Sequence, residues 1–209
     1  KKQFPDGISL AEAVKQLSNS LAKKVLVAKV NGEVTDLRET IVDGSTVEFL
    51  TFADQEGKDT LRHTASHVMA QAIQHLFPGV KFAIGPSIEN GFYYDLDTEH
   101  RFTQEDFAAI EAEMAKIVKE NLPITKEVLS RADALKLFKD AGQDYKVELI
   151  EDLPEDSEIS FYRQGEFVDL CAGPHLMSTK PVKAFKLTSL AGAYWRGNEK
   201  NKMLTRIYG

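Results

Sequence analysis

The sequence contains one cysteine among 209 residues, so no disulfide can form within the chain. No apolar run approaches the roughly 18 residues that a membrane-spanning helix needs, and the start, KKQFPDGISL, lacks the apolar segment of a secretory signal peptide. A basic excess is also missing: the formal net charge is −6, whereas proteins that grip nucleic acid unaided are usually basic. We therefore expect a cytoplasmic protein with no membrane partner. If an RNA binds, we expect this chain to supply only a small part of the binding.

What is present fits a soluble globular chain, with 43% hydrophobic and 28% charged residues. We predict class α+β and two domains, at residues 1–53 and 54–209. In the first domain, Ser9 and Glu12 have capping-box spacing before a helix at 10–17. Strands are expected at 25–30 and 46–52, and the first ends at an Asn31-Gly32 turn.

A polar stretch at 53–59 lacks periodicity, and we interpret it as a linker between the domains. Helices in the second domain are grouped between strands rather than alternating with them one for one. Its expected elements are helices at 60–77, after Thr103 and after Ser130, and strands at 80–84, 91–96, 146–150, 166–170, 182–187 and 203–208.

The stretch LRHTASHVMAQAIQHL places two histidines one helical turn apart. On a helical wheel, His63 and His67 lie nearly opposite an apolar stripe that includes Leu61, Val68 and Leu76. This pattern is typical of a helix with its back in the core and its front on a cleft. An arbitrary HxxxH is more often a surface pair, but the same spacing can bind a metal or share one substrate.

The stretch DLCAGPH holds the single cysteine between an acid and a histidine. Strand alternation places Asp169 and Cys171 on one side, and the Gly173-Pro174 turn can bring His175 back beside them. A buried cysteine alone is more often a small hydrophobe. Together with His63 and His67, however, Cys171 and His175 complete a ligand set that Zn²⁺ accepts in tetrahedral geometry.

HTASH and DLCAGPH together resemble the editing domain of bacterial threonyl-tRNA synthetase. AIGPSIENGFYYD, DYKVELI and AGAYWRGNEKNKMLTRIYG match the same family, and the first 52 residues resemble its TGS module, a ubiquitin-like β-grasp. HxxxH with CxxxH also occurs in alanyl-tRNA synthetase editing domains, whereas FYYD and AYWRG favour the threonyl branch. The resemblance covers nearly the whole chain, and we expect the aminoacylation domain to be absent from it.

The resemblance implies proofreading hydrolysis of seryl-tRNA(Thr), with serine on the acceptor end of tRNA(Thr). It implies no cofactor, and it implies that ATP and threonine bind to the remainder of the synthetase. The implied pocket is lined by His63, His67, Lys146, Asp169, Cys171 and His175. Asp169 would anchor the substrate ammonium, Gly85 would allow close backbone approach, and Tyr94 would bound the amino acid or terminal adenosine.

The chemistry explains why such a site is needed. Serine lacks only a methyl group of threonine, and a pocket rejects one missing methylene-sized group by about 1–3 kcal/mol. A second site that hydrolyses the wrong ester corrects the error. His63 is the first candidate base and Lys146 a candidate oxyanion donor. The alternatives are a zinc-dependent hydrolase of the alanyl type and a non-catalytic tRNA-binding module.

Overall fold

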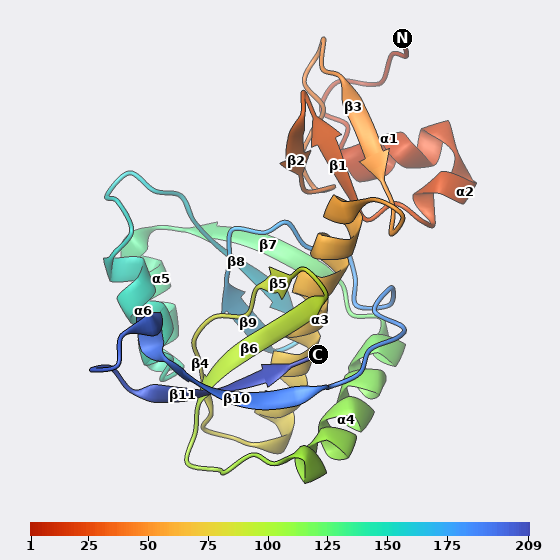
Figure 1. The fold of residues 1–209 in the computed structure, drawn as a ribbon. Helices are drawn as coiled ribbons and strands as arrows, with labels where there is room; N and C mark the ends of the chain where they lie inside the picture. The colour runs from red at the N-terminus through yellow and green to blue at the C-terminus, as the bar shows by residue number, and fades with distance from the viewer.

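The computed structural model describes all residues from Lys1 to Gly209 and shows two units joined by one long helix (Figure 1). The N-terminal unit contains a three-stranded antiparallel sheet in the order β2-β1-β3, with two short helices against it. Its elements are α1 (Leu10–Leu17), α2 (Asn19–Ala22), β1 (Val27–Val30), β2 (Glu33–Thr35) and β3 (Val47–Leu50).

Local signals predicted this unit well. The Ser9 hydroxyl accepts a hydrogen bond from the Glu12 amide and the Glu12 carboxylate accepts one from the Ser9 amide, which confirms the capping box. Asn31 and Gly32 both have positive φ, which confirms the turn between β1 and β2. The strand β2 was not predicted.

The second unit is α+β, as predicted, and is built around α3 (Gln55–Leu76). One sheet has the order β10-β11-β6-β4 with β5 on β6, and the other has the order β7-β8-β9. Its strands are β4 (Lys81–Phe82), β5 (Ser87–Ile88), β6 (Gly91–Asp97), β7 (Ile124–Leu129), β8 (Ile159–Gln164), β9 (Phe167–Leu170), β10 (Ser189–Tyr194) and β11 (Met203–Tyr208). Its other helices are α4 (Phe107–Glu120), α5 (Arg131–Asp140) and α6 (Asp144–Glu151), with 3-10 turns at Gln104–Asp106 and Trp195–Gly197.

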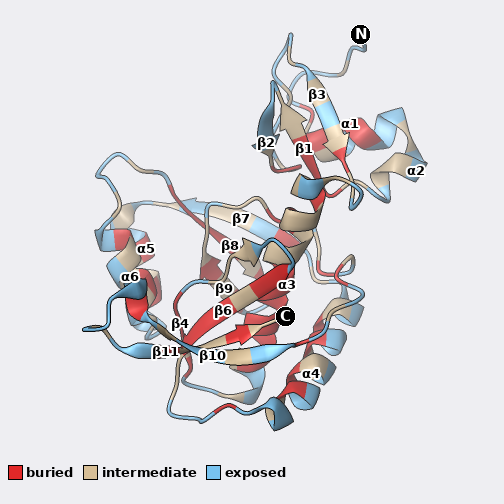
Figure 2. Cartoon of the chain, viewed as in Figure 1, coloured by how far each residue is buried: buried red, intermediate tan, exposed pale blue.

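The second half of α3 forms the centre of the molecule, between α4 and β6 (Figures 1 and 2). Residues from Thr64 to Ile73 are buried all round the helix rather than on one stripe. The sequence predicted a helix with its back in the core and its front on a cleft, whereas α4 and the two sheets cover every side of this part of α3. None of the helices combines the length and the apolar character that crossing a membrane demands.

Three predictions about the second unit were wrong. The stretch at 53–59 is mostly helix, since α3 begins at Gln55, and Glu56 in its first turn forms an ion pair with Lys29 on β1. This turn lacks apolar periodicity because most of its side chains do not face a core. The segment 182–187 buries Val182 and Leu187 but pairs with no strand.

The third error concerns the stretch 146–150, which is helical and belongs to α6. Its alternating apolar residues suggested a strand. In the structure, Lys146 and Ile150 lie one helical turn apart and are both buried, so the helix places them on one face. The strands β7, β8 and β10 were also not predicted.

Candidate active site

Two histidines of α3 face the end of β9. The His63 and His67 ring centroids are 5.2 Å apart. His67 is only 3% exposed, whereas His63 is partly exposed. The prediction that both line a cleft therefore describes His63 better than His67.

The strand β9 and the turn after it supply Asp169, Cys171 and His175. Asp169 pairs with Tyr162 of β8, and the Cys171 amide continues the ladder by donating to the Ser160 carbonyl. The chain then turns at Gly173, where φ is +77° and an added Cβ would lie 2.1 Å from the Tyr162 hydroxyl oxygen. This turn returns His175 to the cluster, as the sequence predicted.

The thiol of Cys171 lies between two imidazoles. Its Sγ is 3.4 Å from His63 Nε2 and 3.2 Å from His175 Nε2, and it accepts a hydrogen bond from the Gly173 amide at 3.2 Å. The His175 ring centroid is 4.0 Å from that of His63 and 4.1 Å from that of His67. Residues more than 100 positions apart in the chain thus form one compact group.

A buried ion pair lies beside these rings. Lys146 Nζ is 2.7 Å from Asp169 Oδ1 and donates hydrogen bonds to the Ala83 carbonyl at 2.6 Å and the Tyr94 hydroxyl at 2.9 Å. The Tyr94 hydroxyl and His67 Nε2 both contact Asp169 Oδ2. The lysine ammonium therefore donates two hydrogen bonds and forms an ion pair with Asp169 Oδ1, and that buried oxygen accepts no hydrogen bond.

Burial sets the protonation of the cluster. It lowers the pKa of His63, lowers that of His67 to about 3 and lowers that of His175 well below its usual value. It also raises the pKa of Cys171 to about 12. Burial alone would raise the pKa of Asp169, but Lys146 and His67 outweigh it and lower that pKa. At neutral pH the imidazoles and the thiol are neutral, and the carboxylate is ionised.

The tautomers follow from groups that can only accept a hydrogen bond. His63 Nδ1 lies 3.3 Å from the Pro174 carbonyl oxygen, so we assign its proton to Nδ1 and a lone pair to Nε2. His67 Nε2 lies 3.1 Å from the Asp169 carboxylate, so we assign its proton to Nε2. His63 Nε2 is therefore a basic nitrogen whose lone pair lies 3.4 Å from Cys171 Sγ.

Gly85 and Tyr94 pack directly on each other. An added Cβ at Gly85 would lie 2.1 Å from the Tyr94 ring, and the Gly85 carbonyl accepts a hydrogen bond from the Ser66 hydroxyl at 2.7 Å. The Tyr94 ring is fully buried, and its hydroxyl points at Asp169 and Lys146. The close approach expected at Gly85 is, in this structure, an approach to the tyrosine ring.

Comparisons with known proteins find relatives of both units. A sequence profile of the TGS domain matches residues 1–51, and one of the threonyl and alanyl tRNA synthetase second additional domain matches residues 159–208. Threonine–tRNA ligase of Clostridium novyi is 64% identical over 203 residues, which cover 97% of this chain and 32% of that protein. Its counterpart in Carboxydothermus hydrogenoformans is 58% identical over 208 residues, which cover 100% of this chain and 33% of that protein.

The chain belongs to the threonyl-tRNA synthetase editing-domain family. This confirms the resemblance seen in the HTASH and DLCAGPH stretches and in the TGS-like first 52 residues. The chain spans about one third of the length of the curated relatives it matches.

Two smaller cavities flank the cluster of this editing-domain homologue. One, of about 190 Å³, opens beside His63 between the start of α3 and the turn at Gly173 and Pro174, and Val34 of the N-terminal unit forms part of its wall. The other, of about 250 Å³, reaches Lys146 and Asp169 from the side of α5. One cavity thus borders the His63 side of the cluster, and the other borders Lys146 and Asp169.

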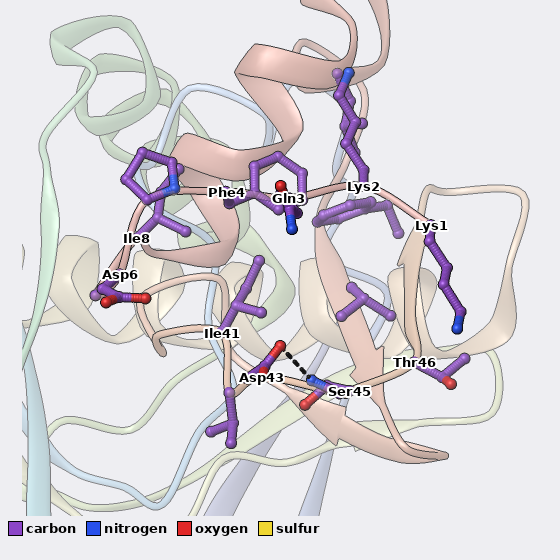
Figure 3. A pocket seen from close by; sticks show the side chains of 17 residues that line it. Lys1, Lys2, Gln3, Phe4, Asp6, Ile8, Ile41, Asp43, Ser45 and Thr46 are labelled. Atoms are coloured by element: carbon purple, nitrogen blue, oxygen red, sulfur yellow. Dashed lines mark hydrogen bonds between the residues drawn. The ribbon is translucent and has the colours of Figure 1, made fainter.

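A larger cavity of about 770 Å³ lies in the N-terminal unit, between the segment Lys1–Ile8 and the segment Ile41–Val47 (Figure 3). The hydrogen bond drawn there, from the Gly44 amide to the Asp43 carboxylate, is local to one turn. No histidine or cysteine lines this cavity. Its charged side chains, Lys1, Lys2, Asp6 and Asp43, are exposed and form no ion pair with one another, so its volume does not make it the catalytic site.

The imidazole–thiol group fits a metal as well as a water. The ligand atoms of His63, His67, Cys171 and His175 all lie within 4.8 Å of one another. Each imidazole has one nitrogen beside a hydrogen-bonding group, namely the Pro174 carbonyl, Asp169 or the Thr64 hydroxyl. Zinc-binding histidines typically show this arrangement. These four residues would hold Zn²⁺, which would supply Lewis-acid activation of water.

Sequence reasoning missed several residues that hold the cluster. The Thr64 hydroxyl lies 2.9 Å from His175 Nδ1 and accepts a hydrogen bond from the Leu176 amide at 3.1 Å. Its position between the two histidines in HTASH is the only sequence signal for this role. The contacts of Asp36 and Arg38 with the segment around His175 have no sequence signal, because they connect positions more than 80 residues apart.

Proposed function

We propose that this chain is a proofreading hydrolase that cleaves the ester of mischarged seryl-tRNA(Thr) in the cluster around His63. The observation that carries the proposal is a neutral imidazole with a basic nitrogen, His63 Nε2, in the same cluster as a fixed carboxylate–ammonium pair. A neutral imidazole can accept a proton from water near pH 7, whereas a protonated one cannot. The family to which the chain belongs gives the substrate class.

The proposed reaction is addition of water to the ester carbonyl. His63 Nε2 takes one proton as the water oxygen bonds to the carbonyl carbon, and the bond to the ribose oxygen then breaks. That oxygen leaves with the proton, so the products are serine and tRNA with a free terminal hydroxyl. Cys171 is a poor nucleophile in this scheme because its thiol has a pKa of about 12.

The present contacts of Lys146 and Asp169 bear on their roles. Two protons of Lys146 are used in hydrogen bonds to the Ala83 carbonyl and the Tyr94 hydroxyl, which leaves the third proton for the oxyanion when substrate binds. For Asp169 to hold the serine ammonium, the ammonium must reach Oδ1, the carboxylate oxygen that only Lys146 contacts. We propose that both residues act on the substrate from this shared position, with Tyr94 and Gly85 fixing the wall behind them.

The proposed partners follow from the family and the covered length. The serine-bearing acceptor end of tRNA(Thr) binds at the His63 cluster of this chain, and the remaining two thirds of a synthetase bind ATP and threonine. The net charge of −6 indicates weak binding of tRNA by the chain alone. The proposed location is the cytoplasm.

Zinc-dependent hydrolysis is the second candidate, because His63, His67, Cys171 and His175 form a complete ligand set. We propose that the site works with water alone, as the threonyl branch implies. Elemental analysis of chelator-treated, active protein separates the two candidates. Activity that disappears with the metal and returns with zinc would establish the zinc-dependent reaction.

The test of the function is hydrolysis of seryl-tRNA(Thr) and threonyl-tRNA(Thr) by the 209-residue chain at high enzyme concentration. We expect serine release, no threonine release, and a rate that falls as salt rises. A His63→Ala preparation, made in parallel, shows whether any hydrolysis comes from a contaminant. Equal rates on both esters would remove the proofreading function, and no hydrolysis of either would leave a tRNA-binding module.

A further inference from the structure

A loop of the N-terminal unit reaches into the second unit behind the active site. Asp36, which follows β2, is 6% exposed. Its Oδ2 accepts hydrogen bonds from the Tyr162 hydroxyl at 2.9 Å and from the His175 amide at 3.2 Å. Its Oδ1 accepts hydrogen bonds from the Arg38 amide at 3.0 Å and from the Arg38 guanidinium at 2.7 Å. One carboxylate of the N-terminal unit therefore binds both its own loop and the backbone of a cluster histidine.

Arg38 holds the other side of the same backbone. Its guanidinium donates to the carbonyl oxygens of His175 at 3.1 Å and Leu176 at 2.7 Å, and also to that of Ile124. The planar group matches several acceptors at once, which an ammonium on a flexible stem would not. The main-chain N–H and C=O of His175 are thus both fixed by the N-terminal unit.

The ring of His175 is fixed by a third contact and by packing. Thr64 lies at hydrogen-bond distance from its Nδ1, and the Tyr162 ring centroid is 4.6 Å from the imidazole centroid. Tyr162 itself is oriented by the hydrogen bond from its hydroxyl to Asp36. With the backbone, the Nδ1 side and one face all held, Nε2 has one direction left, toward Cys171.

The geometry points to Asp36 and Arg38 as positioning residues for His175, so the N-terminal unit completes the active site of the second unit. The expected change in hydrolysis rate rests on the proposed function, whereas the expected change in the position of His175 does not. Other contacts between the units have a different character. The Glu39–Lys126 ion pair, at 3.5 Å, is partly exposed and touches no residue of the cluster.

The buried position of the Asp36–Arg38 pair supports a specific role. Its side chains are 5% and 14% exposed, and taking both charges out of water is costly unless hydrogen bonds replace the lost hydration. Here the second unit supplies five such partners, two of them on His175. A contact that served only to join the units would not need to end on this residue.

The kinetic test uses the whole chain with Asp36→Ala, Arg38→Ala and, as a matched control, Glu39→Gln. We expect the single-turnover rate of seryl-tRNA(Thr) hydrolysis to fall about 10²-fold in the first two variants, because a displacement near 1 Å of a reacting group has that effect. Affinity for a non-hydrolysable seryl-adenosine should stay unchanged. Glu39→Gln, which weakens the same interface elsewhere, should keep the wild-type rate.

Conservative variants separate positioning from a merely structural role. Asp36→Asn keeps one oxygen acceptor for the Tyr162 hydroxyl and the His175 amide but turns an NH2 group toward Arg38, so it should recover part of the rate. Arg38→Lys keeps the charge, but an ammonium cannot reach three carbonyl groups together, so this variant should not recover the rate. If Asp36→Ala fails to fold, the isosteric Asp36→Asn and Arg38→Lys still decide: equal rates in the two variants would overturn the inference.

A measurement without substrate separates the positioning of His175 by Asp36 and Arg38 from the proposed hydrolase function. Imidazole ¹⁵N–¹H spectra, with the His175 signal assigned by its loss in His175→Gln, should show that signal shifted in Arg38→Lys and the His75 signal unmoved. An unshifted His175 signal with an unchanged hydrolysis rate would refute positioning. Absence of hydrolysis in the wild type would remove the proposed function, and the spectra alone would then decide the position of His175.

Discussion

The two halves of the cluster are built on opposite principles. In the half formed by Lys146, Asp169 and Tyr94, charges are present, buried and almost fully used in contacts with one another. In the half formed by His63, Cys171 and His175, no charge is present at neutral pH, and His63 Nε2 carries a basic lone pair. The difference teaches that fixed charges set the electrostatic field, while the neutral groups are the ones that can move a proton.

His67 connects the two halves. Its Nε2 contacts Asp169 in the charged half, and its ring lies 4.1 Å from that of His175 in the neutral half. Because it is almost fully buried, we expect it to transmit the orientation of Asp169 rather than to meet the substrate. The comparison therefore predicts large stability effects in the charged half and large rate effects in the neutral half.

Breaking the buried ion pair has the largest expected effect. Lys146→Ala leaves the Asp169 carboxylate, which is only 3% exposed, without its counter-ion. We expect the free energy of unfolding to fall by about 3–5 kcal/mol, measured by urea denaturation followed by circular dichroism.

The control for this variant is an exposed pair of the same type. Lys136→Ala, which removes an exposed ion pair with Asp140 on α5, should leave the free energy of unfolding unchanged. Lys146→Met combined with Asp169→Leu should be more stable than Lys146→Ala, because no lone charge remains. Equal stability of the Lys146 and Lys136 variants would mean that the charged half is not a desolvated pair.

The two halves were also unequally readable from the sequence. The spacing of His63 with His67, and of Cys171 with His175, predicted the neutral half because each pair is brought together by local structure. Lys146 entered only through the family resemblance, since the alternation around it suggested a strand. Its partner Asp169 lies on another element, and only tertiary packing decides such a meeting.

The fold shows the same division between local and distant causes. The helix starts at Ser9 and Ser130 were predicted because a cap needs only residues three positions apart. The first turn of α3 was missed because contacts with β1 extend it, and the irregular path of 182–187 was missed because burial, not strand pairing, holds it. Arg38, which donates to carbonyls 86 to 138 positions away, could not be predicted at all.

Removing the candidate base should affect rate rather than stability. We expect His63→Ala to lower the single-turnover rate of seryl-tRNA(Thr) hydrolysis by about 10²–10³ while leaving affinity for a seryl-adenosine analogue nearly intact. His75→Ala is the control, since His75 lies on the same helix but pairs with Glu113 and Glu166 at the surface. Similar rates in the two variants would assign proton transfer to another residue.

Acid should destabilise the protein through the neutral histidines. The pKa of His67 is lowered from 6.5 to about 3, so the unfolded chain takes up a proton below pH 6.5 that the folded chain refuses. Above pH 6.5 the histidine is neutral in both states and has no effect, and below it the free energy of unfolding decreases as pH falls toward 3. At pH 5 the loss from His67 alone is about 2 kcal/mol.

The charged half does not contribute over this range, because the pKa of Asp169 is lowered and its contribution is lost only at more acidic pH. His63 and His175, whose pKa values are also lowered, act in the same direction as His67. Urea denaturation of chelator-treated protein at pH 7 and pH 5 measures the difference, which should shrink in His67→Gln. A free energy of unfolding that stays flat or rises toward pH 5 would show that these imidazoles are not held neutral.

The smallest expected effect is on the hydrolysis rate when Cys171, in the neutral half, is replaced. Cys171 lies at its centre, yet a thiol with a pKa of about 12 is protonated at neutral pH and serves only as a hydrogen-bonding group between His63 and His175. Cys171→Ser keeps such a group, so we expect the hydrolysis rate to change by less than about tenfold, the equivalent of roughly one neutral hydrogen bond. Alkylation of Cys171 by iodoacetamide at pH 8 should be slower than that of a free thiol. Because a zinc ion would depend on the thiolate, a variant that lost both its bound zinc and more than 10²-fold in rate would replace the water mechanism with a metal-dependent one.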